Sequence, residues 1–321
     1  MTTRPCTLVL GAAGFIGRHT ARSLAAKGCT VIGVGHGRWT ADEARAFGLH
    51  RWIDTDITLD ALLRLDLAEH VDCIVHCAGS GAVSYSYAEP WNDFQRATVT
   101  TAAVLEWIRR QPHRPRLVFV SSAAVYGDQG DTDTMETSMR SPISPYGFHK
   151  LSAEMLCESS SRFFGIPISI VRLFSVYGEG LRKQLLWDAM NKFDRGEGQF
   201  FGTGNELRDW IHVEDAANLL TLAGLSPQSD FEVYNGGFEH ASTRDVLQHL
   251  ARAYGFGPTV AFNGETHKGN PGRLTSHCGK TSRLLGWTPT VRLQEGMNRY
   301  VTWFKSQRTT LALSGNARAD E

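Results

Sequence analysis

A tyrosine and a lysine stand four residues apart in the segment SPYGFHK, residues 144–150. Residues at this spacing share one face of a helix, so the phenol of Tyr146 and the ammonium of Lys150 can face the same pocket. Ser122 lies 24 residues before the tyrosine, at the end of the apolar run RLVFVSS. A strand end, a loop and a helix in this order can bring all three groups to the carboxyl edge of a parallel sheet.

Each of these three residues has a chemical reason to be there. Tyr146 can exchange a proton with a hydroxyl or carbonyl group while a hydride moves at the same carbon. The positive charge of Lys150 lowers the pKa of a neighbouring phenol, and its ammonium can also hold a nicotinamide ribose. Ser122 can donate a hydrogen bond to a developing alkoxide. The alternative interpretation of the same spacing is an ordinary polar face of a surface helix.

The first half of the chain alternates short apolar runs with amphipathic stretches, which predicts βαβ units and an α/β fold with a Rossmann-type doubly wound parallel sheet. Amphipathic helices are expected at 15–27 and 93–111. The predicted buried strands are 6–12, 29–35, 71–79, 116–122 and 168–174. After residue 175 the pattern loosens around glycine turns at 178–180 and 202–204, which indicates a smaller mixed α/β C-terminal lobe.

This pattern predicts a division of the chain into two units and a tail. Residues 1–174 are expected to form an NAD(P)-binding Rossmann domain, to which residues 209–235 return. Residues 175–208 and 236–305 are expected to form the substrate-binding lobe. The segment 306–321 ends in small and polar residues, and we expect a flexible tail there.

The segment GAAGFIG, residues 11–17, follows the first predicted strand and opens a helix. Gly11 permits a tight turn, Gly14 lets a pyrophosphate approach the backbone, and Gly17 allows close packing of helix on strand. Phe15 and Ile16 complete the turn, and the helix N-terminus faces the anion. We therefore predict a dinucleotide site, with a glycine turn required only for packing as the alternative.

The end of the second strand decides which dinucleotide is expected. NAD-binding folds carry an Asp or Glu there for the ribose 2′-hydroxyl, whereas this chain has Gly35-His36-Gly37-Arg38. An arginine suits a 2′-phosphate by charge and by bidentate geometry. The sequence thus favours NADP(H), supported by His36 and Arg38, and leaves NAD(H) open because Arg38 can equally be a solvated loop residue.

Six further motifs accompany the Ser/Tyr/Lys set in a fixed order over nearly the whole chain. They are GAAGFIG, HCAG (76–79), SAAVYG (122–127), VRLFSVYG (171–178), RDWIHVEDAA (208–217) and LLGWTP (284–289). With these motifs the chain resembles the extended short-chain dehydrogenase/reductase family, in its nucleotide-sugar branch of 4-epimerases, 4-ketoreductases and 4,6-dehydratases. The resemblance implies a nucleotide-diphosphate sugar as substrate and hydride transfer at C4 of the sugar.

The resemblance also implies binding residues. It adds to the cofactor site Asp56, Ile57, Ala78 and Ser121, although Asp56 can equally belong to a helix N-terminus. It assigns to the substrate site Tyr85, Ser86, Ser175, Arg182, Arg208 and Arg273. Lys183, beside Arg182, can also reach a diphosphate, and a solvated helix start is the alternative for both. Two positions depart from the family, which carries asparagine where this chain has Ser175 and Ala97, so an unusual sugar or nucleotide is expected.

Residues that this chain lacks reduce the number of reactions that the resemblance allows. The resembling dehydratases carry Asp and Glu directly after the catalytic Thr or Ser, and decarboxylases carry a Glu there, whereas this chain has Ala123 and Ala124. Alanine moves no proton, so dehydration and decarboxylation are not expected. Gly35 and Arg38 favour reduction of a 4-keto sugar, with 4-epimerisation as the alternative. A non-catalytic NADP-binding sensor is a third interpretation, against which the intact Ser122, Tyr146 and Lys150 argue.

The bulk composition sets the remaining expectations. The 321 residues carry 33 Lys+Arg and 33 Asp+Glu, which argues against a broad nucleic-acid surface. Neither a signal peptide nor an apolar stretch of membrane-spanning length is recognisable, and the six cysteines form no CxxC pair, so we expect a cytoplasmic protein without a metal site. Relatives pair through two long helices, and Leu151, Met155 and Phe163 suit a homodimer or ordinary core packing equally.

Overall fold

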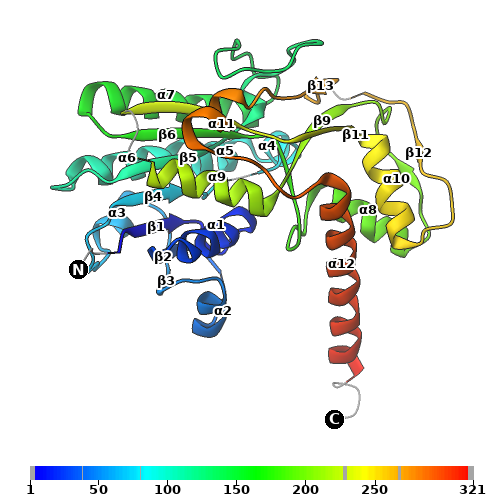
Figure 1. The fold of residues 1–321 in the computed structure, drawn as a ribbon, viewed down its shortest axis with the longest axis horizontal. Helices are drawn as coiled ribbons and strands as arrows, with labels where there is room; N and C mark the ends of the chain where they lie inside the picture. The colour runs from blue at the N-terminus through cyan, green and yellow to red at the C-terminus, as the bar shows by residue number, and fades with distance from the viewer. Residues whose placement is uncertain (1–3, 38, 80, 227–229, 267–268, 317–321) are drawn as a thin grey trace.

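The computed structural model describes residues 4–37, 39–79, 81–226, 230–266 and 269–316. Within these residues, a parallel sheet of seven strands has the order β10-β6-β5-β4-β1-β2-β3. Its strands are β1 (Cys6–Leu10), β2 (Thr30–Gly35), β3 (Arg51–Asp54), β4 (Cys73–His76), β5 (Arg116–Ser122), β6 (Ile168–Leu173) and β10 (Phe231–Gly236). The predicted Rossmann-type doubly wound sheet is therefore confirmed (Figure 1).

Helices cover both faces of this sheet, which explains why its central strands, such as β1 and β5, are buried along nearly their whole length. On one face, α1 (Phe15–Ala26) and α9 (Val213–Leu225) bury residues such as Leu24 and Leu219 against Val9 and Val75. On the other face, α6 (Thr100–Arg110) and α7 (Pro145–Phe164) pack with α3 (Leu59–Leu63) around Leu8. The remaining helices of this half are α2 (Ala41–Ala46), α4 (Val83–Ala88), α5 (Pro90–Phe94) and the π-helical turn Gln95–Val99.

The strand order reverses its direction at β1. The chain runs outward from β1 to β2 and β3 on one side and to β4 and β5 on the other. In open α/β sheets, ligands bind beyond the carboxyl ends of the strands at such a reversal. The glycine turn at residues 11–17, which follows β1, thus lies at the point where this topology places a ligand.

Within the described residues, the smaller lobe combines two small sheets with helices, so the predicted mixed C-terminal lobe is also confirmed. Strands β11 (Glu239–Ser242), β9 (Leu207–His212) and β13 (Arg273–Leu274) form one sheet with β7 (Ser175–Tyr177), and β8 (Gln199–Phe200) pairs with β12 (Ala261–Phe262). Helices α8 (Gln184–Asp194), α10 (Thr243–Tyr254) and α12 (Leu293–Asn316) surround a second core beside the large sheet (Figure 1). Helix α11 (Gly279–Leu285) precedes α12.

Two elements from the second half of the chain, α9 and β10, belong with the large sheet. Because α9 covers this sheet and β10 joins it, while β9 belongs to the small sheet, we propose that the chain returns to the Rossmann domain from residue 213. Helix α12 continues to Asn316, so residues 306–316, predicted as part of a flexible tail, are helical. Among the described residues, no helix has both the length and the apolar character that a membrane span requires.

Candidate active site

A cleft of about 910 Å³ opens between the carboxyl edge of the large sheet and the smaller lobe. Its wall includes Gly14 and Phe15 of the glycine turn, Ser175 of β7, and Phe200 of β8. Ser122, Tyr146 and Lys150 all line this cleft, so the structure brings together the three residues that the sequence selected. Tyr146 and Lys150 are only 8% and 5% exposed, although the cleft itself is open.

The N-terminus of α7 is held from two sides, and this sets the position of Tyr146. Ser144 caps the helix, because its hydroxyl accepts a hydrogen bond from the backbone N–H of Gly147. A Cβ at Gly147 would lie 2.5 Å from the carbonyl oxygen of Ala124, so glycine here permits close approach of α7 to the turn after β5. Ser86 of α4 accepts a 3.0 Å hydrogen bond from the backbone N–H of Tyr146.

Burial changes the proton affinity of both catalytic candidates. It raises the pKa of Tyr146 to about 12, against an opposing hydrogen bond with Ser122. It lowers the pKa of Lys150 to about 8, and the ammonium donates a 3.0 Å hydrogen bond to the carbonyl oxygen of Val120. Burial thereby moves the pKa values of the phenol and the ammonium further apart than those of the free side chains in water, because it disfavours the charged form of each group.

A buried ion pair fixes α7 against the sheet one turn beyond Lys150. The guanidinium of Arg172, on β6, donates two hydrogen bonds to the carboxylate of Glu154, at 2.9 and 2.7 Å. The hydroxyl of Ser121 donates to the same carboxylate at 2.6 Å. Ser121 lines the cleft, as expected for the cofactor site, but its hydroxyl is engaged by Glu154.

The glycine turn has the geometry of a phosphate cradle. Gly11 has φ +79°, and a Cβ there would lie 2.8 Å from the backbone nitrogen of Ala78, so only glycine fits. A Cβ at Gly17 would collide with the carbonyl oxygen of Gly11. The N-cap of α1 is Gly14, which offers no side-chain acceptor to the first N–H groups of the helix. These free donors fit the pyrophosphate of a dinucleotide.

At the end of β2, beside the glycine turn, the charges differ from those that the sequence of β2 alone indicates. Asp56, which follows β3, reaches the end of β2 and lies 2.5 Å from the imidazole of His36. The two side chains are 67% and 71% exposed. A carboxylate therefore stands beside this edge after all, supplied by the adjacent strand. Arg38 lies outside the described residues, and Ile57 packs against the core.

Arg208 is placed to bind an anion. It lines the cleft, and burial lowers the pKa of its guanidinium. Its hydrogen bonds go to the carbonyl oxygens of Leu207 and Pro271 and to the side chain of Asn270, and none of the ion pairs in the described part of the chain involves it. The charges of Glu206 and Asp128 act on it only through space, so a guanidinium without an ion-pair partner in the described part of the chain suits a phosphate group of a ligand.

Four other residues predicted for the substrate site do not appear among those that line the cleft. Ser86 holds Tyr146, and Tyr85 lies under the guanidinium of Arg96. Arg182 donates to Gln307 and lies over the ring of Trp303. Arg273 forms an ion pair with Asp133 at 2.6 Å, so its charge is already compensated. Direct contacts of these four with a substrate stay predictions.

The cleft wall also carries charges that the sequence analysis did not select. Among the described residues, five basic and two acidic side chains line it. Lys192 and Arg195 belong to this set, from the last turn and C-cap of α8, and their spacing of three residues on an amphipathic helix is the signal that identifies them. Arg195 is paired with Glu197 at 2.8 Å, whereas the other four cations of the wall take part in none of the ion pairs among the described residues. The chain as a whole is neutral, so this local excess of positive charge favours an anionic ligand.

A buried aspartate contacts α7, the helix that carries Tyr146 and Lys150. Asp93, on α5, is fully buried and lies 2.6 Å from the Nδ1 atom of His149, the residue before Lys150. Its second carboxylate oxygen has no hydrogen-bond partner. Its charge adds to the burial effect on Tyr146 and opposes that on Lys150, so it favours a higher pKa for both. No local sequence pattern links positions 93 and 149.

Comparison with known proteins agrees with this geometry. Residues 7–237 match the model of the "NAD dependent epimerase/dehydratase family". UDP-glucuronate 4-epimerase of Thermodesulfobacterium geofontis is 27% identical over 312 residues, which cover 93% of this chain and 95% of that protein. An uncharacterized UDP-glucose epimerase of Bacillus subtilis is 30% identical over 310 residues, covering 93% and 98%.

Solved structures show the same likeness. The UDP-glucuronic acid 4-epimerase of Bacillus cereus, solved with UDP-glucuronic acid and NAD, superposes with a TM-score of 0.83 at 27% identity, covering 94% of this chain and 99% of that one. Together with the family match, this confirms the resemblance predicted from the ordered motifs. The chain belongs to the NAD dependent epimerase/dehydratase family.

Proposed function

We propose that the protein is an NAD-dependent nucleotide-sugar 4-epimerase. The observation that carries the proposal is that Ser122, Tyr146 and Lys150 all line the cleft. Ser122 is followed by Ala123 and Ala124 rather than by a second acid/base pair. The sequence favoured a 4-ketoreductase, with the epimerase as its alternative. Relatives named as 4-epimerases support the alternative better than the first choice.

The coenzyme that we propose also differs from the one that the sequence favoured. The sequence favoured NADP(H), because no carboxylate ends β2. Asp56 nevertheless brings a carboxylate to His36 at that edge, where it would repel a 2′-phosphate and accept a hydrogen bond from a ribose hydroxyl. The Bacillus cereus relative was solved with NAD. We therefore propose NAD(H), held at its diphosphate by the glycine turn.

The residues of the chain supply the acid/base part of the reaction. Bound NAD would take the hydride from C4 of the sugar and return it. Tyr146 accepts the proton of the C4 hydroxyl and later gives it back, so one residue serves both half-reactions. Ser122 donates a hydrogen bond to the C4 oxygen, and Lys150 stabilises negative charge on the phenolate. No further proton carrier is required, which agrees with Ala123 and Ala124.

The cleft is suited to a diphosphate and to a sugar that must turn between the two hydride transfers. Arg208 faces the cleft without a carboxylate partner among the described residues, and we propose that it binds the substrate diphosphate. Ser175 has a short side chain and leaves room beside the reacting carbon. Relatives named for UDP-glucose and UDP-glucuronate make UDP-sugars the first substrates to test.

The experiment begins with mass spectrometry of any coenzyme that co-purifies. Purified protein is then incubated with UDP-glucose and UDP-glucuronate, with NAD⁺ added, and the C4 epimers are separated by chromatography. Interconversion that disappears in Tyr146→Phe, with coenzyme binding retained, supports the epimerase. Stoichiometric consumption of NADPH with a 4-keto sugar, without epimerisation, would restore the reductase. Coenzyme binding without any turnover would favour the sensor.

A homodimer is proposed from the outer surface of α7. Phe148, Met155 and Phe163 are exposed there, whereas Leu151 packs against a core cluster. An apolar face of this kind on a long helix is typical of an interface. The mass in solution, measured by light scattering for the wild type and for Met155→Glu, tests it. A monomeric wild type contradicts the proposal.

A further inference from the structure

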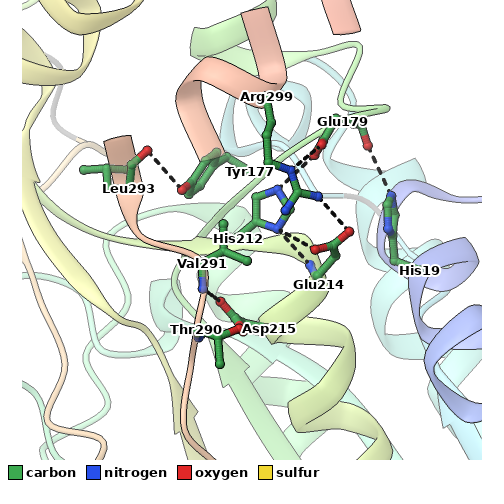
Figure 2. A network of polar contacts seen from close by, with 10 residues as sticks. All are labelled: His19, Tyr177, Glu179, His212, Glu214, Asp215, Thr290, Val291, Leu293 and Arg299. Carbon is green, nitrogen blue, oxygen red and sulfur yellow. Dashed lines mark hydrogen bonds and ion pairs between the residues drawn. The ribbon is translucent and has the colours of Figure 1, made fainter. Parts of the chain in front are cut away.

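The segment that leads from β7 to α8 is fixed at its start by Glu179 (Figure 2). The Glu179 carboxylate accepts a 2.9 Å hydrogen bond from Nε2 of His212 and a 2.8 Å hydrogen bond from Nε of Arg299. Its backbone oxygen lies 3.1 Å from Nε2 of His19, on α1. Burial opposes ionisation of this carboxyl, but its hydrogen bonds outweigh burial and lower its pKa to about 2.

The orientation of His212 follows from its two contacts. Its Nδ1 atom accepts the backbone N–H of Glu214 at 3.3 Å, so the ring proton lies on Nε2 and is donated to Glu179. Arg299, on α12, donates also to the carboxylate of Glu214 at 2.7 Å. Glu179 is thereby tied to His19 of α1, to His212 at the end of β9, and to Arg299 of α12, as Figure 2 shows.

The same segment is fixed again further along. Leu181 is buried, and its carbonyl oxygen accepts a 2.8 Å hydrogen bond from the hydroxyl of Tyr300. Gln184 has φ +65°, the one positive φ among the described residues other than glycine. Its side-chain amide donates to the carbonyl oxygen of Gly81, in the loop after β4. Backbone strain of this kind persists only where surrounding contacts impose it.

Between these anchors, two neighbouring cations point in different directions. Arg182 turns outward to Gln307 on α12. Lys183 lines the cleft, and its Nζ atom lies 3.5 Å from the position of a Cβ at Gly81. None of the ion pairs within the described residues involves Lys183, and desolvation alone lowers the pKa of its ammonium. A rigid segment thus holds an uncompensated positive charge in the cleft.

We propose that Lys183 binds an oxyanion of a bound ligand, either the carboxylate of a hexuronate sugar or the diphosphate of the coenzyme. The inference rests on the proposed function of the cleft as a nucleotide-sugar site. Lys150, whose Nζ lies 3.7 Å from the position of a Cβ at Gly79, borders the same loop. Arg208 instead contacts Asn270 and Pro271, so the two cations are placed for different anions.

The test is calorimetric titration of wild type and Lys183→Met with NAD⁺, UDP, UDP-glucose and UDP-glucuronate. Arg283→Met is the matched control, because it removes an exposed positive charge of α11 that does not line the cleft. Loss of a hydrogen bond to a charged group predicts weakening by roughly tenfold or more. Weakening confined to UDP-glucuronate identifies the sugar carboxylate, and weakening of NAD⁺ identifies the coenzyme diphosphate. Lys183→Arg should retain most of the affinity.

A second variant protects the test against a folding artefact. Gly81→Asp places a carboxylate beside the ammonium without removing it, and the backbone at Gly81 is not in the left-handed region. It should weaken the same ligand as Lys183→Met. Unchanged binding of all four ligands overturns the inference, and so does equal weakening of UDP and both UDP-sugars. If Lys183→Met weakens binding as expected but the wild type epimerises no sugar, only the proposed function is refuted.

Discussion

Replacing Glu154 with Gln tests whether a buried ion pair holds α7, the helix of Tyr146 and Lys150, against the large sheet. Glu154 is fully buried, and its carboxylate accepts two hydrogen bonds from Arg172 and one from Ser121. The isosteric amide keeps the volume but removes the negative charge, which leaves the guanidinium of Arg172 buried without compensation. Breaking a buried pair in this way costs about 3–5 kcal/mol, and we expect the lower end because the amide keeps one acceptor.

The expected consequences are thermal and kinetic. At roughly 2–4 °C per kcal/mol for large domains, a loss of about 3 kcal/mol corresponds to a fall in Tm on the order of 10 °C. Because Lys150 lies one turn and Tyr146 two turns before Glu154 on α7, kcat should fall more than KM rises. Differential scanning calorimetry and initial-rate kinetics measure the two effects.

Glu158→Gln is the matched control on the same helix. Glu158 is 55% exposed and lies 3.9 Å from Arg140, so its loss should change the free energy of unfolding by less than about 0.5 kcal/mol. If Glu154→Gln has the Tm of the wild type, the ion pair with Arg172 does not hold α7 and the reasoning is refuted.

Three further predictions concern ionisable groups. The folded pKa of Lys150 is about 8, below the unfolded value of about 10.5, so the unfolding free energy of the wild type relative to Lys150→Met should rise by about 1.4 kcal/mol per pH unit between these values; a flat difference contradicts it. The charge of Asp93 favours higher pKa values for Tyr146 and Lys150, so Asp93→Asn should move the alkaline limb of the pH–rate profile to lower pH, and an unmoved limb refutes the coupling. The depressed pKa of Glu179, about 2, predicts that the stability lost in Glu179→Gln is present above about pH 4.5 and disappears as the pH falls towards 2, which acid titration of Tm in both proteins measures.

Local sequence signals predicted the parts of the site that are close in sequence or follow a strand. The glycine turn requires Gly11 to adopt φ +79° and Gly17 to face a carbonyl oxygen, and residues of this type at this spacing are visible without a structure. Ser122 follows from the end of a strand, and Tyr146 with Lys150 follows from helical spacing. The alternating strands and helices predicted the Rossmann-type sheet for the same reason, since period and composition are local properties.

Contacts between distant segments could not be predicted in this way. The carboxylate of Asp56 reaches His36 because β2 and β3 are adjacent in the sheet, which reverses the electrostatic argument made from β2 alone. Arg273 is engaged by Asp133, so a cation chosen from its motif has a protein partner. Lys183 and Arg182 are neighbours in the sequence, yet one lines the cleft and the other contacts α12.

The amino-acid sequence by itself determined the fold class, the glycine turn and the residues that we propose as proton carriers, because backbone geometry and side-chain type at short range specify them. Only the tertiary structure decided which charges are paired and which face the cleft. Asp93 with His149, and Glu179 with Arg299, are separated by 56 and 120 residues. The first pair meets because α5 and α7 pack together, and the second because the turn after β7 packs on α12. Burial and pairing set the pKa of an ionisable group and its availability to a ligand, and both arise only when the chain has folded.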